Sequence, residues 1–325
     1  MINIDAGFEV SLVMNVLVAG GAGFIGSNLV DLLLEKGHFV CCVDNLYLGK
    51  LNNIEHLKKC NRFKFYNTNI CDQLEIEKIV RENNIDYVMH LAANSDIQAS
   101  AQNPSIEYEN TYSTTYSILE VMRKNNVKKL FFASTSAVYG NKTEEVLTES
   151  TAQLSPVSYY GAAKLGSEAL ISAYAYMNDM AVLMFRFPNV IGPRLTHGVV
   201  YDFIKKLKLN QQSLEILGDG HQTKPYIYVD DLTEAIVQFM NTPKGIELYN
   251  IGVDTSTSVN RIADIVCEEM NLKDVRYTYT GGSTGWKGDV PRFEYGLEKI
   301  HSAGWKAKYT SDEAIRMAVK WAVNQ

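Results

Sequence analysis

The sequence predicts an α/β protein with a doubly wound parallel sheet and a smaller, interleaved C-terminal α/β domain. Two observations lead to this prediction. Short, strand-like runs of largely apolar residues occur at 15–20, 39–44, 62–70, 87–93, 129–135 and 181–187. Between them lie stretches with helical spacing at 24–37, 73–83, 112–126 and 158–178. Strands that alternate with helices in this way form βαβ units, and βαβ units build a parallel sheet.

The length of 325 residues suits two domains. We expect the first over 14–187, and the second mainly over 188–325, with part of 222–252 returning to the first. In the second domain turn signals dominate, and only 230–241 and 259–271 have a regular helical pattern. Residues 1–13 are either an N-terminal extension ahead of Met14 or a short first strand.

Composition excludes several classes of function. The net charge of −6 argues against a broad nucleic-acid surface, and no apolar run approaches the roughly 20 residues of a membrane span. The five cysteines show no CxxC spacing, and an odd number without a signal peptide indicates reduced thiols and a cytoplasmic location. The six histidines show no metal-binding spacing, so we predict no metal site.

A glycine-rich turn joins the first strand to the first helix. Gly20, Gly23 and Gly26 follow the strand, and such a turn lets the backbone approach a diphosphate at a helix N-terminus. Asp44 ends the next strand, 18 residues after Gly26, near the spacing at which an acid hydrogen-bonds the adenosine ribose. An acid there repels a 2′-phosphate, so NAD is favoured over NADP. The alternative is a plain tight turn with a capping aspartate.

Two later strand ends would also line a dinucleotide-binding cleft. The stretch 67–72, with Asn69 and Ile70, would lie near the adenine. The stretch 90–96 ends the fourth strand, and its small Ala92 and Ala93 would let the cofactor pass close to the backbone, although small residues also suit ordinary packing.

Tyr160 and Lys164 stand four residues apart on a predicted helix and therefore share one face. A free tyrosine has a pKa near 10, which makes it a poor base at neutral pH. A neighbouring ammonium and the positive nicotinamide of an oxidised cofactor would both lower that pKa. The pair is then a general base, or else a packed tyrosine beside a solvated lysine.

Three hydroxyl residues end the strand that precedes this helix. Ser134, Thr135 and Ser136 come at the carboxyl edge of the sheet, where doubly wound folds bind their ligands. This position favours the proton-transfer interpretation of Tyr160 and Lys164.

The ordered motifs "GGAGFIG", "HLAA", "STSAVYG", "YGAAK" and "FRFPNVIGPR" resemble those of the extended short-chain dehydrogenases/reductases. From about Val16 to the C-terminus the chain looks like the nucleotide-sugar epimerase/dehydratase branch, most like UDP-glucose 4-epimerases. The resemblance implies a Rossmann domain, tightly held NAD and a nucleotide-sugar, most plausibly a UDP-sugar, between the two lobes. It also implies a homodimer that pairs the helices 112–126 and 158–178.

The resemblance assigns roles residue by residue. Thr135, Tyr160 and Lys164 match the catalytic positions. The expected cofactor contacts are Gly20, Gly23, Phe24, Ile25, Gly26, Asp44, Asn45, Asn69, Ile70, Leu91, Ala92, Ala93, Asn110, Tyr160, Lys164 and Pro188. The expected substrate contacts are Asn94, Ser134, Thr135, Ser136, Asn189, Val199, Lys224, Tyr226, Trp286 and Asp289. His197 is a phosphate or substrate contact, or else a surface histidine.

The reaction implied is oxidation at C4 of the sugar to a transient ketone, followed by reduction from the other face. Related dehydratases carry an Asp-Glu pair after the catalytic threonine, and here Ser136 and Ala137 stand there. Lys224-Pro225 and Trp286-Lys287 depart from the family pattern, which leaves the nucleotide and the sugar open. The alternatives are a nucleotide-sugar dehydrogenase or reductase, epimerisation at another carbon or on another nucleotide, and a non-catalytic dinucleotide sensor.

Overall fold

The computed structural model describes residues 13–142, 145–285, 288 and 290–325. Most of the expected N-terminal extension, residues 1–12, lies outside the described residues, as do Trp286 and Asp289.

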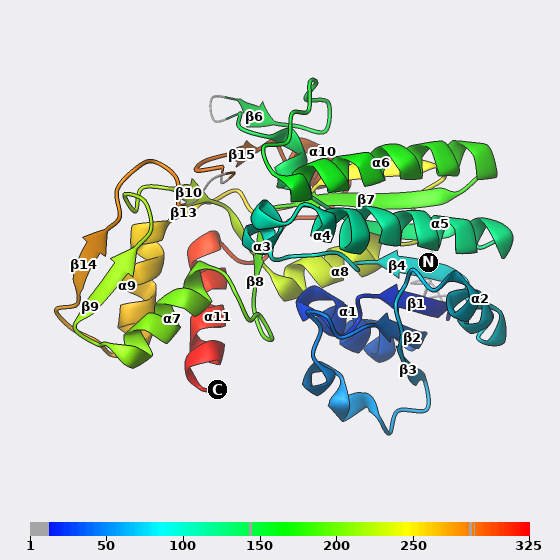
Figure 1. Ribbon diagram of the computed structural model, residues 1–325, viewed down its shortest axis with the longest axis horizontal. Helices are drawn as coiled ribbons and strands as arrows, with labels where there is room; N and C mark the ends of the chain where they lie inside the picture. The colour runs from blue at the N-terminus through cyan, green and yellow to red at the C-terminus, as the bar shows by residue number, and fades with distance from the viewer. Residues whose placement is uncertain (1–12, 143–144, 286–287, 289) are drawn as a thin grey trace, which may run out of the picture.

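A seven-stranded parallel sheet forms the centre of the first lobe, which confirms the predicted fold class (Figure 1). Its strands follow the order β12-β7-β5-β4-β1-β2-β3. Their bounds are β1 Asn15–Ala19, β2 Phe39–Asp44, β3 Phe63–Asn67, β4 Tyr87–His90, β5 Lys129–Thr135, β7 Ala181–Phe187 and β12 Ile246–Asn250. Because β12 joins the sheet beside β7, the chain returns to the first lobe after it has entered the second.

Helices cover both faces of this sheet, and alternate strand residues supply two cores. On one face Val16 and Val18 pack with α1 (Phe24–Glu35) and α8 (Val229–Phe239). On the other face Leu17 and Ala19 pack with α2 (Gln73–Glu82), α5 (Ser113–Lys124) and α6 (Tyr159–Asn178). Figure 1 shows α5 and α6 lying side by side along the sheet. Strands buried on both faces explain the continuous apolar runs of the sequence.

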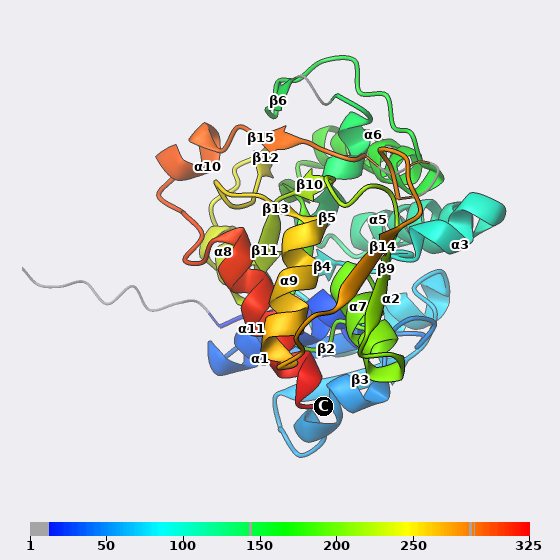
Figure 2. The same ribbon diagram turned by 90° about the vertical axis from the view of Figure 1, so that its left-hand side faces the viewer.

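The second lobe is more regular than the sequence predicted. Its core lies among α7 (Val199–Leu209), α9 (Val259–Glu269) and α11 (Ser311–Val323), which pack on one another (Figure 2). Short strand pairs complete the lobe: β8 (Asn189–Ile191) with β11 (Tyr226–Tyr228), β9 (Ser213–Ile216) with β14 (Arg276–Tyr279), and β10 (Thr223–Lys224) with β13 (Thr257–Ser258). The helices α7 and α11 correct the expectation that loops dominate here.

Short elements connect these parts. They are η1 Leu51–Asn53, η2 Glu55–Leu57, α3 Ile97–Gln102, α4 Ser105–Glu107, the π-helical η3 Tyr108–Tyr112, η4 Ser136–Tyr139, β6 Val146–Leu147, β15 Glu294–Tyr295 and α10 Glu298–Ser302. Within the described ranges, none of the helices combines the length and the apolar character that a bilayer crossing requires.

Candidate active site

The glycine loop between β1 and α1 crosses close to the loop that follows β4. Gly20 has a φ of +81°, and a Cβ there would lie 2.8 Å from the backbone nitrogen of Ala92. A Cβ on Gly26 would lie 2.1 Å from the Gly20 carbonyl oxygen. Only glycine permits this close passage, so the two loops form one continuous floor beneath the start of α1.

The N-terminus of α1 faces the resulting cavity. Its N-cap is Gly23, which offers no side-chain oxygen to the first-turn N–H groups. Gly23, Phe24, Ile25 and Gly26 all line the cavity. Free N–H groups and the positive end of the helix dipole suit the diphosphate of a dinucleotide.

Asp44 lies at the end of β2, almost fully buried. Its Oδ2 accepts a hydrogen bond from the Ala22 N–H at 3.0 Å, and its Oδ1 accepts one from the Leu46 N–H at 2.8 Å. Burial raises the pKa of Asp44, and these backbone donors oppose that rise. The carboxylate lines the cavity beside Asn45, at the place where the sequence predicts the adenosine ribose.

The cavity has a volume of about 510 Å³ and collects every residue expected to hold the cofactor. Asn69 and Ile70 follow β3, Leu91, Ala92 and Ala93 follow β4, Asn110 comes from η3 and Pro188 follows β7. With the glycine floor, the uncapped helix start and the buried acid, these walls fit NAD.

Three reactive side chains meet at the carboxyl edge of the sheet. Thr135 ends β5, Tyr160 lies in the first turn of α6, and Lys164 follows one turn later, all on the cavity wall. The Thr135 hydroxyl lies close enough to Tyr160 to favour its phenolate. The Lys164 ammonium donates to the Ala133 carbonyl at 2.8 Å and lies 6.0 Å from the centre of the Tyr160 ring.

Burial is the largest influence on the pKa values of Tyr160 and Lys164. Burial raises the pKa of Tyr160, and the Glu107 charge adds to the rise, while the Thr135 hydroxyl opposes it. Burial lowers the pKa of Lys164 to about 8, against the opposing charges of Glu107 and Glu168. The sequence predicted that Lys164 would help to lower the pKa of Tyr160. In the folded protein, desolvation of the phenolate raises the pKa of Tyr160 instead.

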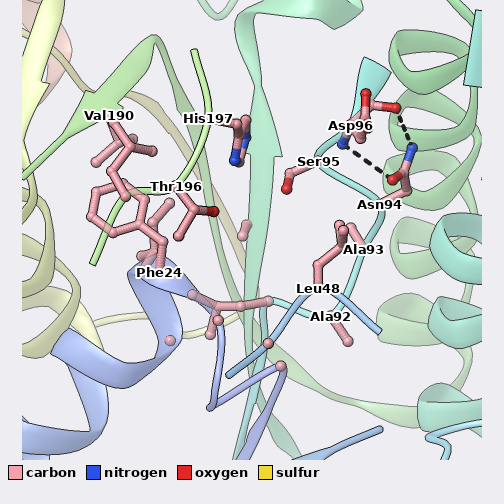
Figure 3. Close-up of a pocket in the computed structure, with 18 of the residues that line it drawn as sticks. Phe24, Leu48, Ala92, Ala93, Asn94, Ser95, Asp96, Val190, Thr196 and His197 are labelled. Carbon is pink, nitrogen blue, oxygen red and sulfur yellow. Dashed lines mark hydrogen bonds between the residues drawn. The ribbon is translucent and has the colours of Figure 1, made fainter. Parts of the chain in front are cut away.

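Five residues expected to contact the substrate line the same cavity: Asn94, Thr135, Asn189, Val199 and Tyr226. The amide of Asn94 is already engaged. It donates to the Asp96 carbonyl at 2.9 Å and accepts from the Asp96 N–H at 3.1 Å (Figure 3). It also donates to Glu107 at 2.8 Å. The Asn94 amide is therefore held by other protein groups, and its main contribution is to the shape of the cavity wall.

Three further expected substrate contacts, Ser134, Ser136 and Lys224, do not line this cavity. Ser134 is fully buried and donates to Glu168, because side chains alternate along β5 and Thr135 takes the cavity side. Ser136 begins η4 and does not line the cavity. Lys224 lies in β10 outside the cavity lining, and Trp286 and Asp289 lie outside the described residues.

The structure adds residues that were not among the expected contacts. Ser95 and Asp96 lie on one wall of the cavity, and Thr196 lies on the opposite wall beside His197, which is thereby a cavity residue (Figure 3). Burial lowers the pKa of His197, and the charge of Asp96 opposes that change. Glu107, buried behind Asn94, is another addition. A glutamate in the polar stretch 103–110 has no sequence signal that separates it from a solvated one.

The fold and the site define a dinucleotide-binding enzyme with a Tyr-Lys pair beside a second lobe. The model of the NAD dependent epimerase/dehydratase family matches residues 16–252. The chain belongs to this family, and it is an isomerase of the NAD-dependent nucleotide-sugar epimerase kind.

Three relatives illustrate the range of similarity. A putative UDP-glucose 4-epimerase of Methanocaldococcus jannaschii is 33% identical, over 95% of this chain and 98% of that protein. The crystal structure of UDP-glucose 4-epimerase from Thermotoga maritima with UDP-glucose has a TM-score of 0.86 at 32% identity, over 95% of this chain and 98% of that one. A human dTDP-D-glucose 4,6-dehydratase is 29% identical, over 94% of this chain and 89% of that protein.

Proposed function

We propose that this enzyme interconverts UDP-sugars that differ at C4, with UDP-glucose and UDP-galactose or their N-acetyl forms as substrates. The observation that carries the proposal is the meeting of Thr135, Tyr160 and Lys164 on the wall of a cavity that fits NAD. The second lobe closes the other side of this cavity with Asn189, Val199 and Tyr226.

Each residue has a role in this proposal. Tyr160 takes the proton of the sugar 4-hydroxyl and returns it, and the Thr135 hydroxyl orients that exchange. Lys164 holds a positive charge behind the phenol and anchors the nicotinamide ribose. NAD, when bound, would accept a hydride from C4 of the sugar and could return it to either face of the resulting ketone. Contacts to the remote nucleotide hold the sugar while it turns.

The two residues after Thr135 favour epimerisation over dehydration. Loss of water from the sugar requires an additional acid and base, and Ser136 and Ala137 stand in that position. Ala137 contributes only its backbone N–H, which donates to Thr135 Oγ1 at 3.2 Å. A nucleotide-sugar dehydrogenase or reductase, or an epimerase for another nucleotide or carbon, is the alternative that Lys224-Pro225 keeps open.

We also propose a cytoplasmic homodimer. The helices α5 and α6 lie together and expose Tyr116, Tyr176 and the small Ala162, Ala169 and Ala173, a surface on which a second copy could pack. All five cysteines are free thiols, which suits a reducing compartment.

The test is a conversion assay on the purified protein without added cofactor. UDP-galactose and UDP-N-acetylgalactosamine are incubated separately, and the sugar C1 proton is followed by NMR. We expect the gluco epimer to appear with wild type and not with Tyr160→Phe. Consumption of added NAD in proportion to product would establish a dehydrogenase instead. Absence of conversion with NAD bound would reject these UDP-sugars and direct the assay to dTDP-, GDP- and CDP-sugars.

A further inference from the structure

Glu107 is a buried carboxylate directly behind the active-site wall. It ends α4, its residue is 2% exposed, and the π-helical turn η3 follows it. Its Oε1 accepts from the Asn94 amide at 2.8 Å and its Oε2 from the Thr111 hydroxyl at 2.7 Å. Within the described ranges, no ion pair joins a lysine or arginine to Glu107.

The position of Glu107 brings its charge to the Tyr160–Lys164 pair. Both α4 and η3 pack on α6, the helix that carries the pair. The Glu107 charge raises the pKa of Tyr160 and also that of Lys164. It thus favours the neutral phenol and the charged ammonium, the resting protonation states of a tyrosine base with a cationic neighbour.

The other ionisable groups around the pair either carry no charge or form an ion pair with a group of opposite charge. Glu168 faces Lys164 from α6, but Arg186 of β7 donates to both of its oxygens, at 2.9 and 2.6 Å. His90 of β4 is fully buried, and burial together with Lys164 lowers its pKa to about 3, so it carries no charge at neutral pH. Among the residues that the structure describes, Glu107 is therefore the negative charge near the pair that no ion pair offsets.

A purely structural linker would not need this charge. Burying an ionised carboxylate costs free energy, and a glutamine side chain could also hydrogen-bond to Asn94 and Thr111. The presence of a glutamate at this position is consistent with a function for the charge itself.

We propose that Glu107 is a positioning residue whose buried charge sets the proton balance of the Tyr160–Lys164 pair. It balances the Lys164 ammonium and keeps the Tyr160 proton in place until another positive charge enters the cavity. The oxidised nicotinamide is such a charge, so binding of NAD⁺ and activation of the base are coupled. This inference rests on the roles proposed for Tyr160 and Lys164, but not on the identity of the sugar.

Two substitutions separate charge from geometry. Glu107→Gln keeps the size of the side chain and removes its charge, whereas Glu107→Asp keeps the charge and disturbs the two hydrogen bonds. The readout is the alkaline ultraviolet titration of tyrosine in the NAD-loaded protein. Subtracting the same titration of a Tyr160→Phe protein in each background isolates the Tyr160 signal.

We expect Tyr160 in Glu107→Gln to titrate at lower pH than in wild type, and Glu107→Asp to stay near wild type. In the conversion of UDP-galactose, both limbs of the pH–rate profile of Glu107→Gln should move to lower pH, because Tyr160 and Lys164 each lose their protons more readily. A Tyr160 titration that does not move in Glu107→Gln, whatever happens to rate or melting temperature, would make Glu107 a structural linker and overturn the proposal.

The titration requires no sugar, so it is independent of the proposed function. A shifted titration without conversion of any UDP-sugar would reject the substrate and keep the role of Glu107. Conversion of a UDP-sugar with an unshifted titration would support the substrate and reject the role of Glu107. If Glu107→Gln does not fold, Glu107→Ser repeats the test, because it removes the charge and leaves room for water.

Discussion

The two lobes bring their residues to the cavity in different ways. In the sheet lobe, Asp44, Ala92 and Thr135 come at or just after the ends of neighbouring parallel strands, whose register fixes them against one another. In the second lobe, Asn189 lies in a three-residue strand, and His197 and Val199 come from a loop and the start of a helix. We therefore expect the chemical step to depend on the sheet lobe and sugar recognition to depend on the second lobe.

The division of roles between the lobes is tested most directly by removing one tyrosine hydroxyl from each lobe. Tyr160 and Tyr226 line the same cavity from opposite lobes. We expect Tyr160→Phe to lower kcat by roughly 10²- to 10⁴-fold, the usual contribution of a general base, and Tyr226→Phe to act mainly on KM. Steady-state kinetics with UDP-galactose measure both, and an equal loss of kcat in the two variants would contradict the division between lobes.

The same contrast explains how much of the molecule the sequence could predict. The bounds of β2, β5 and β7 were predicted to the residue, because strands buried on both faces appear as largely apolar runs. The residues expected to hold the cofactor all line one cavity, since glycine spacing and strand ends determine backbone placement. Ser134 was misplaced because its hydroxyl was judged by chain position, although the alternation of side chains along β5 directs it away from Thr135.

The second lobe offered weaker signals, and one was overlooked. Thr310 and Glu313 form a capping box that marks the start of α11. The helix α7 begins directly after Gly198, whose φ is positive, and its first residue, Val199, was expected only as a substrate contact. Glu107 could not be found from the sequence, because only the packing of α4 and η3 on α6 buries it.

The pH dependence of stability tests the cost of burying Lys164. Its pKa is lowered to about 8 in the folded protein, so between about pH 8 and the ordinary value of 10.5 the unfolded chain binds more protons. The unfolding free energy therefore rises with pH across this window, by up to about 3 kcal/mol. Urea denaturation at several pH values should show this slope in wild type and a reduced slope in Lys164→Met. Equal slopes would place the lysine's charge in solvent.

Crowding at the glycine loop predicts a smaller effect. A Cβ on Gly26 would lie 2.1 Å from the Gly20 carbonyl oxygen, so Gly26→Ala must displace backbone. We expect a loss of about 1–3 kcal/mol in stability, together with loss of the NAD that copurifies. Gly245→Ala, in the loop before β12, is the matched control because a Cβ there meets nothing within 4 Å. Retention of NAD by Gly26→Ala would show that the loop does not hold the cofactor.

The smallest expected effect compares two helix caps, one in each lobe. Ser158 caps the N-terminus of α6, where its hydroxyl accepts a hydrogen bond from the Gly161 N–H at 3.1 Å. Thr310 caps the N-terminus of α11, where its hydroxyl accepts one from the Glu313 N–H at 3.3 Å. Removing either cap by substitution with alanine should cost about 1 kcal/mol of stability, seen as a lower urea midpoint. Only Ser158→Ala should also lower kcat, because Tyr160 lies in the first turn of the helix that Ser158 caps. A fall in kcat with Thr310→Ala would mean that the second lobe also controls the chemical step, and the division drawn between the lobes would not hold.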